Sequence, residues 1–243
     1  MKAFAGGFLA CSFFAALIPA RAQEIYGDAS APIAGKVLGT IIHTLEVEEL
    51  RYVILKRLTD RYADDKGITV TQAEKDAYVK QVQDRMKEDR ERQEARRDEL
   101  TRKLADSGLS AAERESLASE LDRVNKFIAA LAETGGEATE NPEEVKAARD
   151  QVAAAFIRQW KINRALYQQY GGRIIFQQGG PEPLDAYRRF LEERQAQGEF
   201  EILNKDLEPP FWHYYRTDAI HSFFPPGSKE EAQAFESPPW QSK

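Results

Sequence analysis

The sequence is poor in the residues that most often carry chemistry, with one cysteine and three histidines among 243 residues. The cysteine, Cys11, lies in a leader-like segment that we expect to be removed, so the mature chain has no thiol. This excludes disulfide bonds, thiolate catalysis and cysteine-ligated metals from the mature protein. Its stability must therefore come from packing.

Sequence motifs for nucleotide binding, acyl transfer and metalloprotease chemistry are also missing. No phosphate-binding glycine loop, G-x-S-x-G elbow or H-E-x-x-H pattern occurs. His43, His213 and His221 do not have the spacing of metal ligands, and we expect neither a metal nor a cofactor. The 40 acidic residues outnumber the 34 basic ones, for a net charge of −6, which argues against nucleic acid as a partner.

The first 22 residues have the pattern of a secretory signal peptide. Lys2 precedes an apolar run over residues 3–18, and Ala-Arg-Ala at residues 20–22 matches a cleavage site. The run is shorter than the roughly 20 residues that a membrane span needs. We therefore expect export to the periplasm, cleavage after Ala22 and no membrane span in the mature chain. A retained anchor and a lipoprotein modified at Cys11 are the alternatives.

Residues 23–86 are expected to form the first part of a helical body. Apolar residues recur at three- and four-residue spacing over residues 44–65, which predicts an amphipathic helix. Gly67 can end this helix, and Thr71 with Glu74 forms a capping box for the next one. The second helix is expected to bury one face, made of Tyr78, Val79, Val82 and Met86.

Residues 87–133 are expected to leave the body as an antiparallel helical hairpin. Residues 87–99 hold six acidic and five basic side chains without a large apolar residue, a composition typical of a solvated helix. Ser110 and Glu113 then form a second capping box. A coiled-coil seam follows it, made of Leu117, Leu121, Val124, Ile128 and Leu131. This seam either pairs within the hairpin, with Leu100 and Leu104, or docks a partner.

Residues 142–203 are expected to form a long body helix and a small β-α-β element. Asn141 and Pro142 predict the start of the helix, and Gly171-Gly172 its end. A strand over 173–177, a helix over 183–197 and a strand over 199–203 follow. Residues 204–243 combine three Pro-Pro pairs with aromatic residues, which predicts an extended arm that wraps the body or stays mobile. The fold class is therefore mainly α.

One segment carries a family resemblance. Residues 67–74, with Gly67, Ile68, Val70, Thr71 and Glu74, have the Gly-Ile/Val-x-Val-Thr-x-x-Glu turn between two helices. Residues 35–90 thereby resemble the N-terminal region of SurA/PrsA-type periplasmic chaperones. The resemblance implies a foldase that binds unfolded or outer-membrane-bound polypeptides without ATP. About 70 residues follow Gly172, which is short for the parvulin domain of that family, so no catalytic residue is carried over.

Three functions are left open by these patterns. A chaperone would hold clients in the concavity between hairpin and body, and on the aromatic residues Phe211, Trp212, Tyr214 and Tyr215, which alternatively fill the body's own core. An adaptor would dock one dedicated partner, or a second copy as a homodimer, through the hairpin seam. A peptidyl-prolyl cis-trans isomerase is the third.

Overall fold

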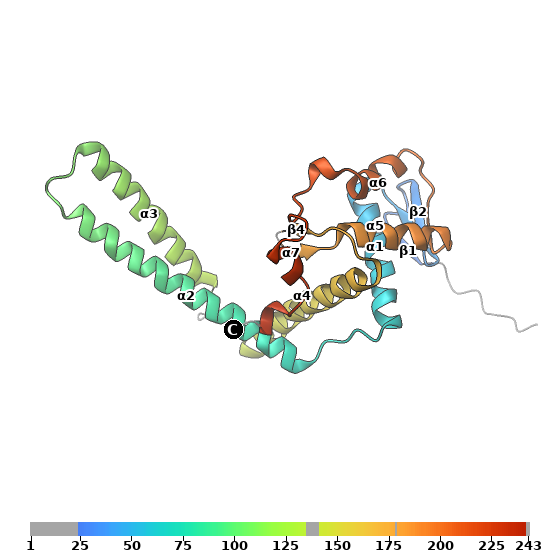
Figure 1. Cartoon of the computed structure of the whole chain (residues 1–243), viewed down its shortest axis with the longest axis horizontal. Helices are drawn as coiled ribbons and strands as arrows, with labels where there is room; N and C mark the ends of the chain where they lie inside the picture. Colours follow the sequence, from blue (N-terminus) through green and yellow to red (C-terminus); the bar gives the residue numbers. More distant parts are fainter. Residues whose placement is uncertain (1–23, 135–140, 178, 242–243) are drawn as a thin grey trace, which may run out of the picture.

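The computed structural model describes residues 24–134, 141–177 and 179–241. The expected signal peptide lies outside these residues. The chain is mainly α, as the sequence predicts, and consists of a body from which a two-helix hairpin projects. Figure 1 shows the hairpin leaving one end of the body, with the sheet at the opposite end. Among the described residues, no helix is long and apolar enough to cross a membrane.

A four-stranded sheet closes one end of the body. Its strands are β1 (Ile25–Gly27), β2 (Ile33–Val37), β3 (Thr40–His43) and β6 (Phe200–Ile202), in the order β1-β3-β2-β6. β1 runs parallel to β3, and β2 is antiparallel to both β3 and β6. Gly35 is required beside β6, because a Cβ there would lie 2.7 Å from the Glu201 carbonyl oxygen. A strand from the C-terminal half thus completes an N-terminal sheet.

The expected β-α-β element is not a unit of its own. β4 (Ile175–Gln177) pairs with β5 (Gly180–Glu182) in a separate two-stranded sheet, whereas β6 joins β2. No strand was predicted at residues 180–182, which turn back along β4. The helix between β5 and β6 is α5 (Leu184–Ala196), and each of its ends lies within one residue of the expected 183–197.

The main core lies between the sheet and four helices. These are α1 (Val47–Asp65), α4 (Pro142–Tyr170), α5 and α6 (Glu208–Arg216). Each contributes fully buried side chains to one cluster with β2, β3 and β6, for example Ile54, Leu166, Phe190 and Phe211. Gly171, at φ +61°, ends α4 as the sequence predicts.

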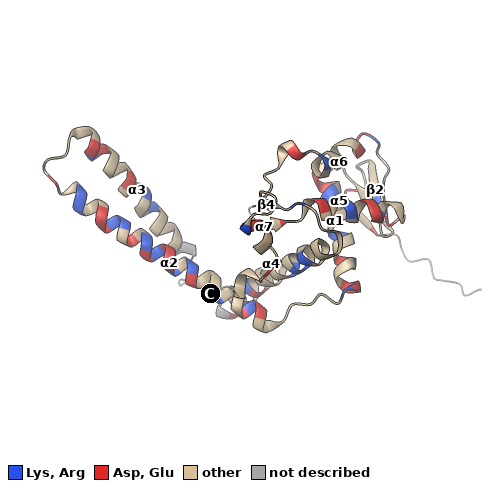
Figure 2. Ribbon diagram, viewed as in Figure 1, with Lys and Arg blue, Asp and Glu red and all other residues tan. Residues whose placement is uncertain are grey.

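The hairpin consists of α2 (Gln72–Leu104) and α3 (Ala111–Thr134). Both capping boxes are confirmed: Thr71 and Glu74 exchange hydrogen bonds at the start of α2, and Ser110 and Glu113 do so before α3. α2 is one continuous helix that packs on α4 near its start and on α3 further out. Basic and acidic residues alternate along both hairpin helices (Figure 2).

The C-terminal residues are more helical than expected. Pro209 and Pro210 lie in the first turn of α6, where their missing N–H groups cost nothing, so they start a helix instead of extending the chain. Residues 217–241, here called the C-terminal strap, contain two 3-10 turns and α7 (Lys229–Gln233). The strap bonds to Ile174 through Phe224 and ends with Trp240 at the base of the hairpin. It wraps the body, one of the two arrangements that the sequence leaves open.

Candidate functional site: an apolar cleft at the hairpin base

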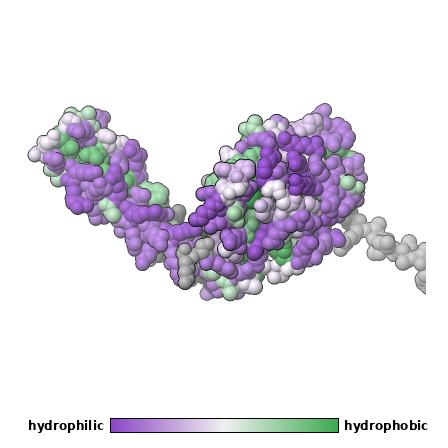
Figure 3. Space-filling view, viewed as in Figure 1, coloured by the Kyte–Doolittle hydropathy of each residue, from purple (hydrophilic) through white to green (hydrophobic). Residues whose placement is uncertain are grey.

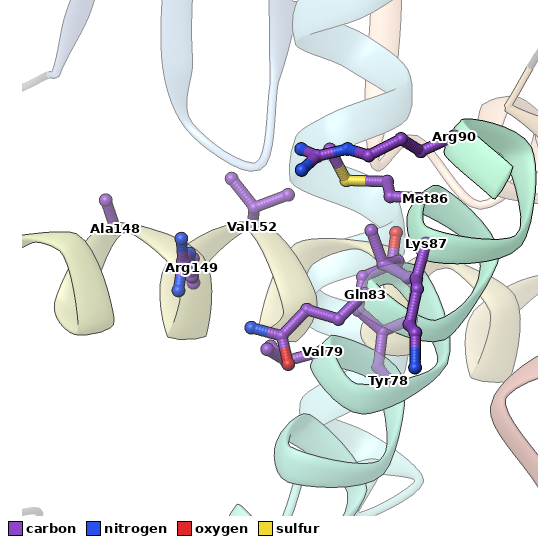
Figure 4. Close-up of a pocket in the computed structure, with 10 residues that line it drawn as sticks. Tyr78, Val79, Gln83, Met86, Lys87, Arg90, Ala148, Arg149 and Val152 are labelled. Atoms are coloured by element: carbon purple, nitrogen blue, oxygen red, sulfur yellow. The ribbon is translucent and has the colours of Figure 1, made fainter. Parts of the chain in front are cut away.

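A cleft of about 540 Å³ lies where α2 separates from α4. We call it the hairpin-base cleft. Its apolar lining comes from α2 and from the first turns of α4, and consists of Tyr78, Val79, Val82, Met86, Ala148 and Val152. Figure 4 shows Met86 and Arg90 extending from α2 toward the side on which α4 presents Val152. The space-filling view shows hairpin and body joined at this base, with a hollow between them (Figure 3).

The α2 stripe was expected to be buried, and in the structure it is not. Tyr78, Val79 and Met86 are half-buried, and Val82 is 38% exposed. On α4, Val152 and Phe156 are 53% and 46% exposed. The reason is geometric: α2 leaves the body at a point where α3 does not yet cover it. Apolar positions that match a buried helix face therefore line an open cleft.

The rim of the cleft is cationic. Lys87 and Arg90 on α2 and Arg149 on α4 line it, and no acidic side chain does so among the described residues. Lys87 lies 3.9 Å from Glu91 in an exposed pair, and Arg90 donates a hydrogen bond to the Leu131 carbonyl oxygen at 3.5 Å. The cleft thus joins an apolar floor to local positive charge in a chain of negative net charge.

Ion pairs fix the start of α2 to α4 just below the cleft. Lys161 lies 2.6 Å from Glu74, and hydrogen bonds from Lys161 and Thr71 lower the pKa of Glu74, although desolvation opposes them. Asp150 accepts hydrogen bonds from Gln72 and Lys146, which lower its pKa. The helix pair that forms the floor is therefore held at a defined angle.

The strap seals the other side of the base. Trp240 contacts Trp160 and Tyr78 edge-on, with ring centroids 5.3 and 6.4 Å apart. Tyr78 in turn stacks on Phe156 at 5.7 Å. Trp240, Trp160 and Phe235 belong to a second core cluster that is separate from the main core, and Tyr78 packs against it. Tyr78 is therefore shared between this cluster and the wall of the cleft.

The aromatic residues expected to bind clients lie elsewhere. Phe211, Trp212 and Tyr215 are at most 5% exposed, and Tyr214 is half-buried. They belong to the main core or pack against it, because α6 turns its apolar face to α1 and α5. The structure thus agrees with the alternative in which they fill the body's core, and it does not present them as an exposed surface.

The hairpin seam faces α2. Val124 is buried, and Leu117, Leu121, Ile128 and Leu131 are half-buried. Leu100 of α2 is fully buried, and Arg96 donates to Glu120 at 2.6 Å across the two helices. The seam side chains are therefore already packed within the hairpin.

The three histidines lie apart, each with a hydrogen-bond partner. His43 Nδ1 donates to the Ala31 carbonyl oxygen at 2.6 Å, and His221 Nε2 to that of Tyr214 at 2.6 Å. His213 pairs with Thr217 at 3.0 Å. Within the described ranges, no group of three or more His, Cys, Asp or Glu side chains could hold a metal ion.

Sequence reasoning placed a client surface between hairpin and body but did not identify the residues of this cleft. Met86 was recognised as part of an apolar helix face, but nothing indicated that Arg149 and Val152 lie opposite it, because α2 and α4 meet only through the tertiary fold. The abrupt change from apolar to charged residues at Lys87 was the one available sign of where α2 leaves the body. Comparisons with protein-family models, curated proteins and solved structures found no match to this chain.

Proposed function

We propose that the protein is an ATP-independent chaperone that holds apolar segments of unfolded polypeptides in the hairpin-base cleft. The observation that carries the proposal is the exposure of Val82 and Val152 in the lining of one cavity. A contiguous exposed apolar patch on a folded protein is commonly a binding site. The resemblance of residues 35–90 to SurA/PrsA-type chaperones and the expected export to the periplasm support the same function.

The lining suits weak and adaptable contacts. Met86 has an unbranched, polarisable side chain that adjusts to different partners, and the flexible stems of Lys87 and Arg90 cover apolar surface while their charges stay in water. A site of this kind binds many sequences without demanding one shape. Its cationic rim favours apolar segments flanked by Asp or Glu.

Suppression of aggregation by residues 23–243 tests the proposal. An unfolded outer-membrane β-barrel protein is the client, mixed at near-equal stoichiometry. We expect the intact chain to suppress light scattering and Val152→Asp to lose most of this effect, because a carboxylate then occupies the apolar floor. Leu45→Asp is the matched control, since Leu45 is 64% exposed and outside the cleft.

Site-specific photocrosslinking locates the contact. A photoreactive residue at Gln83, in the cleft, is expected to capture the client, whereas one at Glu115, exposed on α3, is not. Equal suppression by Val152→Asp and the intact chain, with crosslinks from both positions, would remove the cleft as the client site. Absence of suppression by the intact chain would favour the adaptor function, for which a pull-down with the hairpin is the next step.

A further inference from the structure

A second cavity, of about 420 Å³, lies in the body and is separate from the hairpin-base cleft. Tyr187 of α5 and Tyr214 and Tyr215 of α6 line it, together with Arg51 of α1 and Glu182 of β5. We call it the tyrosine cavity. Its volume is within the range of small-molecule sites in proteins.

In one part of the cavity wall, a network of hydrogen bonds holds the polar side chains in place. The Tyr187 hydroxyl donates to Asn163 Oδ1 at 2.5 Å and accepts from Gln159 Nε2 at 2.7 Å. Asn163 Nδ2 also donates to the Pro181 carbonyl oxygen at 3.0 Å, which holds β5 against α4. These groups hold the wall in place before any ligand arrives.

Glu182 is the unusual group in the cavity. Its carboxylate accepts a hydrogen bond from the Tyr214 hydroxyl at 3.3 Å, and no Lys, Arg or His forms an ion pair with it among the described residues. The residue as a whole is half-buried, yet desolvation of its carboxyl group raises the pKa to about 7. A desolvated carboxylate without a cation is costly, and in proteins such a group is normally paired.

A second group also lacks a partner. Tyr215 is 2% exposed, and its hydroxyl makes no hydrogen bond within the described part of the chain. Buried hydroxyl groups are satisfied in most structures. The Tyr215 hydroxyl is therefore an unsatisfied group on a residue that lines the cavity.

Arg51, a cation that lines the cavity, does not form an ion pair with Glu182. Arg51 lies over the Tyr214 ring, 4.8 Å from its centroid, and its nearest carboxylate is Glu48 at 3.9 Å. Its charge is thus directed at the ring face and at Glu48. The contact also shows that the Tyr214 face accepts a cation, as tyrosine rings commonly do.

We propose that the tyrosine cavity binds a small organic cation with a primary ammonium group, held by the Glu182 carboxylate and by the Tyr215 hydroxyl oxygen. A primary ammonium has three donors and no acceptor, which matches two acceptors in a partly aromatic wall. A metal ion is a poorer occupant, because the described residues hold no group of three His, Cys, Asp or Glu ligands. This site is independent of client binding at the hairpin base.

Calorimetric titration of residues 23–243 with n-butylammonium tests the proposal. We expect saturable binding at pH 8 that weakens about tenfold or more at pH 5.5, because Glu182 takes up a proton below its pKa of about 7. Glu182→Gln, which keeps the shape, is expected to lose at least tenfold in affinity at pH 8. Glu115→Gln removes one exposed carboxylate on α3 and should bind as the intact chain does.

Further probes separate the contacts. Tetramethylammonium carries the charge without donors, and n-butanol has no charge, so both should bind at least tenfold more weakly than n-butylammonium. Tyr215→Phe should weaken n-butylammonium several-fold and keep the fold, because it removes an unpartnered hydroxyl.

Three outcomes would overturn the proposal: no binding of n-butylammonium by the intact chain at millimolar concentration, equal binding by Glu182→Gln, or equal binding of n-butanol. A pH dependence that survives in Glu182→Gln would also overturn it, by assigning the proton to another group. The titratable and charged groups facing Glu182 or its partner Tyr214 are Glu48, Arg51, Tyr52, Tyr187, Tyr215 and His221.

Discussion

At the scale of single residues, the burial of Glu182 makes the stability of the protein depend on pH. Desolvation raises its folded-state pKa from 4.5 to about 7, and the hydrogen bond from Tyr214 only partly opposes this. Between these two values the folded chain binds more protons than the unfolded chain, so the contribution of Glu182 to stability falls as pH rises through 7. Below pH 4.5 both states carry the proton and no penalty remains.

We therefore predict that Glu182→Gln stabilises the protein at pH 8 and has little effect at pH 4. A pKa shift from 4.5 to about 7 lowers the free energy of unfolding by roughly 3 kcal/mol at pH 8. Denaturant unfolding at the two pH values, without added amines, measures the difference. A variant less stable than the intact chain at pH 8 would contradict this account of the carboxyl group.

The residues that the sequence identifies and those it misses differ in the range of their interactions. Thr71 with Glu74 and Ser110 with Glu113 are recognisable because each pair acts within one turn of helix. Gly172 was expected only to end a helix. In the structure it also makes room for Asp185, because a Cβ there would lie 2.4 Å from that of Asp185. Contacts of this kind depend on the tertiary fold and leave no local pattern.

At the scale of elements, the hairpin has a small core of its own. Leu100 is fully buried and Val124 nearly so, whereas most other hairpin residues are exposed or half-buried. The Arg96 pairs with Glu120 and Glu99 are largely exposed and contribute little by themselves. The hairpin therefore depends on a few apolar contacts and can open without unfolding the body.

We predict that Leu100→Ala destabilises the outer half of the hairpin by about 2–5 kcal/mol, the usual cost of such a cavity. Amide hydrogen exchange should speed up in α3 and in the outer part of α2. Tryptophan fluorescence should not change, since Trp160, Trp212 and Trp240 all lie outside the hairpin. Thr101→Ala, at an exposed position next to it, is the control; equal exchange in both variants would refute the prediction.

The helices were largely predictable from sequence, and the pairing of strands was not. The bounds of α2 and α4 follow from caps and glycines that act locally. β6 pairs with β2, which lies more than 160 positions earlier in the chain, and neither segment has a sequence pattern that indicates this pairing. The apolar faces were recognised as well, but whether another element covers them, as at Val82 and Val152, depends on where helices diverge.

At the scale of the whole molecule, the C-terminal strap joins the hairpin base to the body. Trp240 is 5% exposed and packs on both Tyr78 of α2 and Trp160 of α4. Gln81 of α2 also donates a hydrogen bond to the Pro239 carbonyl oxygen. The angle of the hairpin is thus set by three segments, of which the strap is the last in sequence.

We predict that Trp240→Ala releases the strap and broadens the range of hairpin angles, since removing a buried tryptophan costs about 3–5 kcal/mol. Spin labels on cysteines at positions 45 and 115, one on the body and one on the hairpin, would report this as a wider distance distribution. Ser237→Ala, in an exposed part of the strap, should leave the distribution unchanged. An unchanged distribution in Trp240→Ala would show that the strap does not set the angle.

The strap also sets an order of folding. Arg96 and Glu120 are 24 residues apart, whereas Gln81 and Pro239 are 158 apart. Contacts between distant residues form later, because the chain must first close a longer loop. The contacts between α2 and α3 can therefore form before the strap packs against the base of the hairpin. The proposed client surface would then be completed last, so a half-folded copy would have little means of competing for clients with the finished protein.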